Sequence, residues 1–137
     1  MERREFLRNT VAFCGALSLF SIEGCTPSRS VTGEFENGKL KIKKIDFAQD
    51  KWIVVNSNKT NGPVLLSKND QGEYSAVLMI CTHKQCEVKP AGTLLSCPCH
   101  GAEFSFTGKV LKEPADKDLQ SYPTSANGEY VYIQILK

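Results

Sequence analysis

Two short stretches decide the fold and chemistry of this chain: residues 81–86, Cys-Thr-His-Lys-Gln-Cys, and residues 97–101, Cys-Pro-Cys-His-Gly. The protein has 137 residues with two histidines and six cysteines, and both histidines and four of the cysteines fall in these stretches. Thiols and imidazoles gathered in one short part of a chain are typical of a metal site. The two stretches therefore predict a metal centre that the rest of the chain supports.

Length and composition limit the other possibilities. A chain of 137 residues makes a single domain, and 41% hydrophobic with 23% charged residues indicates a globular protein rather than a disordered one. The net charge of +2 is small, and no run of lysine and arginine with interleaved aromatic residues occurs, so we expect no nucleic-acid partner. Six cysteines in so small a chain indicate disulfides, a metal, or both.

The N-terminus has the pattern of an export signal. Basic residues come first, an apolar run follows over 11–22, and a small residue, Gly24, precedes Cys25. The run is shorter than the roughly 20 residues that a helix needs to cross a bilayer, so we do not expect a permanent anchor. A buried or amphipathic helix is the alternative, and the absence of a polar stripe at helical spacing disfavours it. The expected organisation is a signal over 1–24, a polar tether over 25–32 and a folded domain over 33–137.

Two resemblances sharpen this assignment. Arg3-Arg4-Glu5-Phe6-Leu7 resembles the twin-arginine signal, which implies export of an already folded, cofactor-loaded protein to the periplasm or the outer face of the cell membrane. Ile22-Glu23-Gly24-Cys25 resembles a lipoprotein processing box, which implies that Cys25 accepts a lipid and tethers the chain to the membrane. The alternative for Cys25 is a thiol without function in the leader or tether.

From about Gly33 onward the apolar residues recur with period two, and turn residues separate the runs. The Asn-Gly pairs at 37–38 and 127–128 suit tight hairpins, because both residues tolerate positive φ. We expect no helix of ten or more residues after the leader. The pattern predicts an antiparallel all-β domain with one loop-rich insertion near 81–118. The expected strands are 40–47, 52–56, 64–67, 74–80, 93–96, 104–106, 109–111 and 130–136.

The spacing of the metal-binding residues leaves more than one reading. Cys-x-His at 81–83 and Cys-x-x-His at 97–100 offer two thiolates and two imidazoles from two loops, which can bind zinc tetrahedrally or an iron–sulfur cluster. When two cysteines hold one iron and two histidines the other, the result is the mixed ligation of a Rieske [2Fe–2S] centre. A structural zinc-binding module is the alternative, which is disfavoured because zinc sites prefer closely spaced cysteine pairs.

Both stretches resemble the Rieske family, because Cys81-Thr82-His83 and Cys97-Pro98-Cys99-His100-Gly101 match its two boxes at their defining positions. The resemblance implies a Rieske-type antiparallel β-sandwich or barrel, a small cluster-binding subdomain and one [2Fe–2S] cluster per chain. The implied ligands are Cys81 and Cys97 for the inner iron, and His83 and His100 for the outer one.

Two further cysteines, Cys86 and Cys99, match the extra pair of the bc-type and arsenite-oxidase-type branch, which forms a disulfide between the two loops. Such a bond would pin two loops that have little core of their own. It also agrees with export to an oxidising compartment.

The residues around the boxes depart from the family in ways that bear on its potential and partner. Ala102 and Phe104 stand where high-potential members of the family carry Ser and Tyr, whose hydroxyls hydrogen-bond to the sulfurs. Because such hydrogen bonds raise the reduction potential, we expect a potential in the lower half of the Rieske range of about −150 to +300 mV. Lys84 replaces a leucine that packs at the quinol site, and it would suit an acidic partner surface. A solvated lysine is the alternative. Pro114 lies in a segment that resembles the loop covering the cluster.

These features predict one-electron transfer, as an exported carrier or as an electron-transfer subunit of an oxidoreductase, and no catalytic residue of the chain's own. The expected partner is a redox protein, either a cytochrome or the large subunit of an oxidoreductase. A Rieske subunit of a quinol-oxidising cytochrome bc-type complex is the alternative. The zinc-binding module is a third reading, from another functional class.

Overall fold

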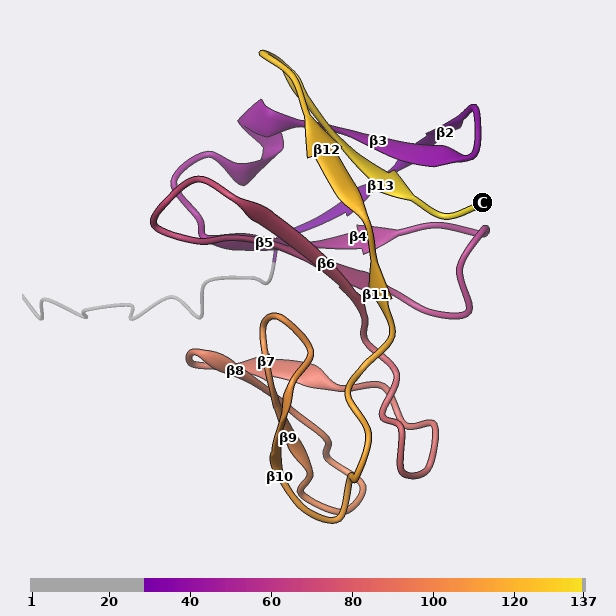
Figure 1. The fold of residues 1–137 in the computed structure, drawn as a ribbon, viewed down its shortest axis with the longest axis vertical. Coiled ribbons are helices and arrows are strands. Elements are labelled where there is room, and N and C mark those ends of the chain that lie inside the picture. Colours follow the sequence, from indigo (N-terminus) through magenta and orange to yellow (C-terminus); the bar gives the residue numbers. More distant parts are fainter. Residues whose placement is uncertain (1–28, 137) are drawn as a thin grey trace, which may run out of the picture.

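Three β-sheets stacked in layers make up the protein (Figure 1). The structure is a computed structural model that describes residues 29–136, so the expected signal segment and Cys25 lie outside the described residues. A five-stranded sheet with the order β1-β4-β5-β6-β11 lies in the middle. A four-stranded sheet, β12-β13-β3-β2, covers one of its faces. A second four-stranded sheet of shorter strands, β10-β9-β8-β7, lies on its other side and is called the small sheet below.

The strands of the described residues are short, and nearly all of them pair antiparallel. Their bounds are β1 (Ser30–Thr32), β2 (Glu34–Glu36), β3 (Lys39–Lys43), β4 (Trp52–Asn56), β5 (Val64–Lys68), β6 (Tyr74–Leu78), β7 (Lys89–Ala91), β8 (Leu94–Ser96), β9 (Glu103–Ser105), β10 (Val110–Lys112), β11 (Ser121–Tyr122), β12 (Thr124–Ala126) and β13 (Tyr130–Gln134). Between residues 29 and 136, no helix is long and apolar enough to cross a membrane. The expected all-β fold is confirmed.

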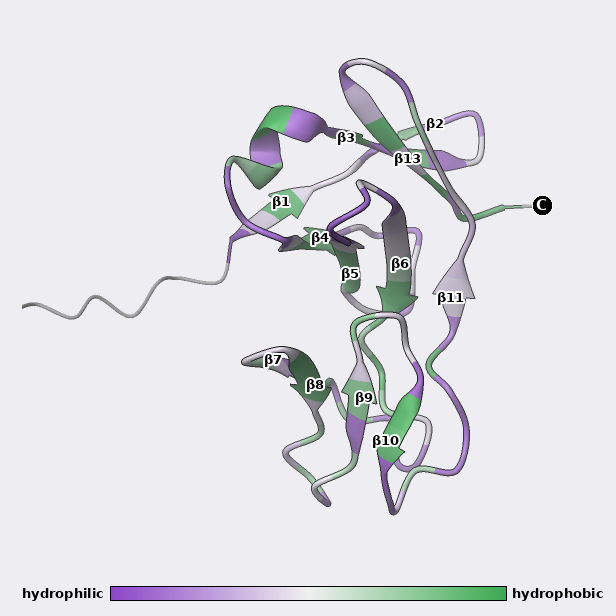
Figure 2. Cartoon of the chain, turned by 60° about the vertical axis from the view of Figure 1, so that its left-hand side comes forward, coloured by the Kyte–Doolittle hydropathy of each residue, from purple (hydrophilic) through white to green (hydrophobic). Residues whose placement is uncertain are grey.

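The middle sheet is buried on both faces, which explains the unbroken apolar run of β5. Successive side chains of a strand point to opposite faces. Val64 and Leu66 therefore enter the core shared with β3 and β13, whereas Leu65 enters the core shared with the small sheet. Strands covered on both faces read as continuous apolar runs rather than as an alternation. Figure 2 shows β5 and β8 largely in green, the colour of apolar residues.

The two cores have different neighbours. The first lies between the two larger sheets and contains Leu40, Ile42, Phe47, Ile53, Val55, Val64, Leu66, Ala76, Leu78, Val131 and Ile133. The second lies between the middle sheet and the small sheet and contains Leu65, Val77, Met79, Cys81, Val88, Leu95, Cys97, Ala102, Phe104, Ala115 and Leu119. The two predicted metal-binding thiols, Cys81 and Cys97, therefore belong to the second core.

Four expectations need correction. The first strand begins at Ser30, inside the expected tether, because Ser30–Thr32 pairs with the edge strand β4. That pairing is parallel, so the domain is not wholly antiparallel. The expected strand 40–47 ends at Lys43, where a 3-10 helix (Lys44–Phe47) turns the chain and buries Phe47. The segment 81–118, expected to be loop-rich with strands at 93–96, 104–106 and 109–111, also contains the unexpected strand Lys89–Ala91, which completes a four-stranded sheet.

The Asn37-Gly38 hairpin is confirmed. Both residues have positive φ, 50° and 79°, and they join β2 to β3. This is the geometry that a two-residue turn needs to follow the twist of its strands.

Candidate metal centre

Two loops that share one backbone pattern carry the predicted ligands. In the first, the amide of Cys81 donates to the carbonyl of Cys86 at 2.7 Å, and the amide of Gln85 donates to the carbonyl of Cys81 at 2.9 Å. In the second, the amide of Cys97 donates to the carbonyl of Ala102 at 2.8 Å, and the amide of Gly101 donates to the carbonyl of Cys97 at 2.9 Å. Each loop is thus a tight turn that begins at a buried cysteine.

The fifth residue of each loop has left-handed backbone geometry, with φ of 61° at Gln85 and 78° at Gly101. Glycine adopts this conformation freely, but a residue with a Cβ atom is strained in it by about 1–2 kcal/mol. The first loop therefore keeps the shape of the second at a cost in backbone energy.

The thiols of the two loops lie on the inner side of the site. Cys81 is 0% exposed and Cys97 is 1% exposed, and both are free cysteines. Burial raises the pKa of the Cys81 thiol, and its side-chain contact with Cys97 raises that pKa further, whereas the backbone amide of His83 lowers it. A pair of adjacent thiols with no cation beside them is at its most stable protonated or bound to a metal.

The imidazoles lie on the outer side. The ring centroids of His83 and His100 are 5.0 Å apart, and the rings meet edge to face at 88°. His83 is half-buried and His100 is exposed. Two buried thiols and two solvent-facing imidazoles thus come together at one end of the small sheet, which confirms that the two sequence boxes meet in space.

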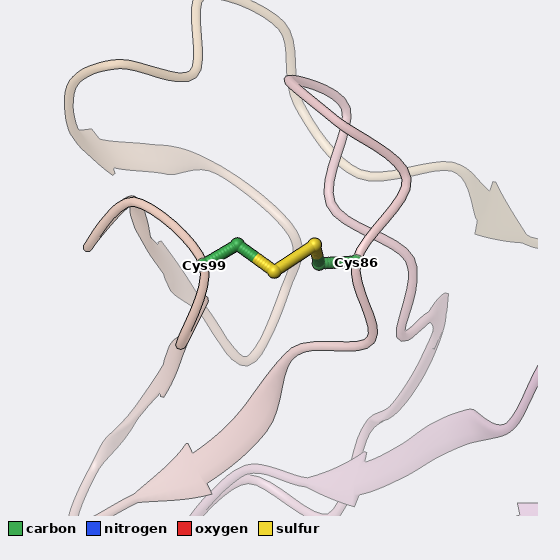
Figure 3. The surroundings of a disulfide bond; sticks show 2 residues. All are labelled: Cys86 and Cys99. Atoms are coloured by element: carbon green, nitrogen blue, oxygen red, sulfur yellow. A yellow bond between two sulfur atoms is a disulfide. The ribbon is translucent and has the colours of Figure 1, made fainter.

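The disulfide between Cys86 and Cys99 is confirmed (Figure 3). Its S–S distance is 2.01 Å and it joins the end of the first loop to the middle of the second. The Sγ atom of Cys97 lies within 4.8 Å of both sulfurs of this bond. Because two of the three sulfurs are bonded to each other, the group does not form a separate metal site.

The residues expected to set the potential and the partner lie in two environments. Ala102 and Phe104 are fully buried in the second core, and neither side chain carries a hydroxyl. Lys84 and Pro114 are exposed. No described ion pair involves Lys84, which leaves its charge available to solvent or to a partner.

The segment 113–118, which contains Pro114, is fastened at two points. The hydroxyl of Thr82 donates to the carbonyl of Lys117 at 2.7 Å, which ties the first loop to this segment. The carboxylate of Asp118 accepts hydrogen bonds from the amide of Val110 at 3.0 Å and from the Lys109 ammonium at 2.9 Å. Sequence reasoning missed Thr82 and Asp118, because contact partners so far along the chain leave no local pattern.

The donor set fits a mixed-ligand iron–sulfur cluster. The thiols lie on the inner side of the site and the imidazoles on the outer side, so one iron would have two sulfur ligands and the other two nitrogen ligands. The buried thiols are in an apolar core, which suits a dry cluster better than a solvated ion.

Comparison with known proteins agrees with this geometry. A family model described as the Rieske [2Fe-2S] domain matches residues 31–123. The chain is 30% identical to a cytochrome b6-f complex iron-sulfur subunit of Chlorobaculum thiosulfatiphilum, over 96% of this chain and 75% of that protein. The corresponding subunit of Chlorobaculum tepidum is 28% identical, over 98% and 76%. The crystal structure of the cyanobacterial plasma membrane Rieske protein from Synechocystis PCC 6803 is 39% identical, with a TM-score of 0.58, over 66% of this chain and 93% of that one.

Proposed function

The chain belongs to the Rieske [2Fe–2S] family and transfers electrons through one such cluster, and we propose that Cys81, His83, Cys97 and His100 hold it at the outer face of the cell membrane. The observation that carries the ligand assignment is the meeting of two buried thiols with the paired His83 and His100 rings. A structural zinc module is not favoured, because the family match covers both ligand loops.

The different roles of these four ligands follow from their exposure to solvent. When bound, the cluster supplies one-electron chemistry without an open metal position for a substrate. Cys81 and Cys97 would bind within the second core and keep water from the inner side. His100 is exposed and His83 half-buried, so their ring edges would face a redox partner that docks at this end of the molecule.

Location at the membrane is supported by the leader and by one relative. The segment 1–24 carries the twin-arginine-like pattern, and Cys25 is the candidate lipid acceptor. One similar protein of known structure is described as a plasma membrane Rieske protein. The Cys86–Cys99 disulfide suits an oxidising compartment.

A potential in the lower half of the Rieske range forms part of the proposal. Ala102 and Phe104 are buried in the same core as Cys81 and Cys97, and they carry no hydroxyl at the two positions where the resemblance implies Ser and Tyr in high-potential members. Hydrogen bonds to the sulfurs favour the reduced state, so their absence lowers the potential, toward about −150 mV rather than +300 mV.

A second candidate is the Rieske subunit of a quinol-oxidising cytochrome bc-type complex. The names of the similar subunits from the two Chlorobaculum species favour it. Lys84, in place of an apolar residue at the loop tip, and the expected low potential favour a separate carrier or a subunit of another oxidoreductase.

Purification from the native membrane distinguishes the two candidates. The tagged full chain is extracted in mild detergent, and its haem spectrum and quinol-dependent reduction are recorded. The first candidate predicts no stoichiometric b-type haem and no reduction by added quinol. Stoichiometric b-type haem together with quinol-dependent reduction would overturn it and establish the second.

A further inference from the structure

Three sulfur atoms meet at the centre of the site, and only two of them are bonded. The Sγ atoms of Cys86, Cys97 and Cys99 lie within 4.8 Å of one another. Cys86 and Cys99 form the disulfide, whereas Cys97 is a free, buried thiol beside it. A thiol next to a disulfide is the starting arrangement for thiol–disulfide exchange.

We propose that Cys97 exchanges with the Cys86–Cys99 disulfide whenever the chain lacks its cluster. The Cys97 sulfur loses its proton to solvent and bonds to the Cys86 sulfur, the Cys86–Cys99 bond breaks, and the Cys99 sulfur takes up a proton. One thiol and one disulfide give one thiol and one disulfide, so the step needs no oxidant or reductant.

Two features set the direction of the exchange. Cys99 is exposed, so water solvates its sulfur as it leaves, whereas Cys86 is half-buried. Attack on Cys99 instead would close a small ring around Pro98, whose φ is fixed. Bonding to Cys86 avoids this ring and keeps the two loops joined.

The exchange would have a consequence for maturation. It removes Cys97 from the donor set and leaves the exposed thiol of Cys99 in its place. This inference rests on the proposed ligand role of Cys97, because a sulfur bound to iron is not free to attack. Cluster insertion must then come before the disulfide forms, which agrees with export of an already loaded chain.

Two serine variants of the full chain test the exchange without chemical removal of the cluster. Cys81→Ser and Cys97→Ser each lack one proposed ligand, but only the first keeps the attacking thiol. Both are isolated without reductant, alkylated in denaturant with excess N-ethylmaleimide, and sequenced by mass spectrometry. We expect label on Cys99 and a Cys86–Cys97 bridge in Cys81→Ser. In Cys97→Ser we expect, among the cysteines of residues 81–99, label on Cys81 alone and an intact Cys86–Cys99 bridge.

Label missing from Cys99 in Cys81→Ser would overturn the proposal, and so would a Cys97–Cys99 bridge with Cys86 labelled. Should Cys81→Ser fail to fold, the loaded wild-type chain provides the second measurement. Its cluster is removed anaerobically with an iron chelator, the folded chain is alkylated without denaturant before and after removal, and label is expected on the exposed Cys99 only after removal. Label on Cys99 while the visible absorption of the cluster is intact would contradict the ligand role of Cys97 and leave the exchange standing.

Discussion

The hydroxyl of Thr82 lies 2.7 Å from the carbonyl oxygen of Lys117, across 35 residues of chain. This hydrogen bond joins the residue between two proposed ligands to segment 113–118, which resembles the family's cluster-covering loop. Within residues 29–136, it is the side-chain hydrogen bond that links the first ligand loop to 113–118.

Replacing Thr82 by Val removes this link while keeping the branched shape. We expect a loss of about 1 kcal/mol in the free energy of unfolding, which is the net worth of one hydrogen bond. We also expect faster bleaching of the cluster by a chelator, because the segment over it opens more often. Urea unfolding and the bleaching rate measure the two effects. Thr82→Ser, which keeps the hydroxyl, should behave like the wild type. Equal behaviour of the valine variant would show that the hydrogen bond restrains nothing.

The left-handed backbone at Gln85 gives a second prediction. Gln85→Gly should raise the free energy of unfolding, by up to about 1 kcal/mol, because relief of the strain exceeds the added flexibility of glycine in the unfolded chain. Gln71→Gly is the matched control, since Gln71 is an exposed turn residue without positive φ, and it should lose stability. Similar losses in both variants, measured by urea unfolding, would refute the strain.

A hydroxyl at position 104 tests the cause of the low potential. Phe104→Tyr should raise the midpoint potential by about 65–130 mV, because a hydrogen bond from its hydroxyl to a charged sulfur, worth about 1.5–3 kcal/mol, favours the reduced state of this one-electron couple. Redox titration followed by circular dichroism gives the value. Phe106→Tyr is the control, because Phe106 is half-buried against Trp52 and outside the ligand loops. An unchanged midpoint potential in Phe104→Tyr would show that the side chain at position 104 does not set the potential.

The ion pair at the base of segment 113–118 predicts a dependence of stability on pH. The hydrogen bond from Lys109 lowers the pKa of the Asp118 carboxyl, and the backbone amide of Val110 lowers it further. A lowered carboxyl pKa contributes stability that is present above the pKa of the unfolded chain and is lost as the pH falls through the folded pKa. Asp118→Asn should therefore flatten part of the decline in urea midpoint below about pH 4. Asp116→Asn, at an exposed neighbour without a described hydrogen bond, should leave the decline unchanged. Identical curves for both variants would contradict a role for the pair.

The sequence predicted the chemistry of the site better than the details of the fold around it. Cys81, His83, Cys97 and His100 could be found because their spacing within each loop is local, and the loops themselves need no helix or long strand. The disulfide followed from family resemblance alone, since Cys86 and Cys99 gain their proximity only when the loops meet.

The strands that the sequence did not predict were missed for one physical reason. Ser30–Thr32 and Lys89–Ala91 are three-residue strands with one or no large apolar side chain each, so no apolar run marks them in the sequence. They form because a neighbouring strand offers free backbone groups, which is a tertiary effect. The same holds for the Thr82–Lys117 contact, which no local pattern could indicate.

The central claim, that two cysteines and two histidines hold a [2Fe–2S] cluster, is tested most directly by metal analysis joined to electron paramagnetic resonance of the reduced full chain. We predict about two irons and two acid-labile sulfides per chain. We also predict an average g value below that of the free electron, and nitrogen couplings from two imidazoles that fall to one in His100→Cys. A colourless protein that holds zinc, or a cluster without nitrogen couplings, would contradict the account.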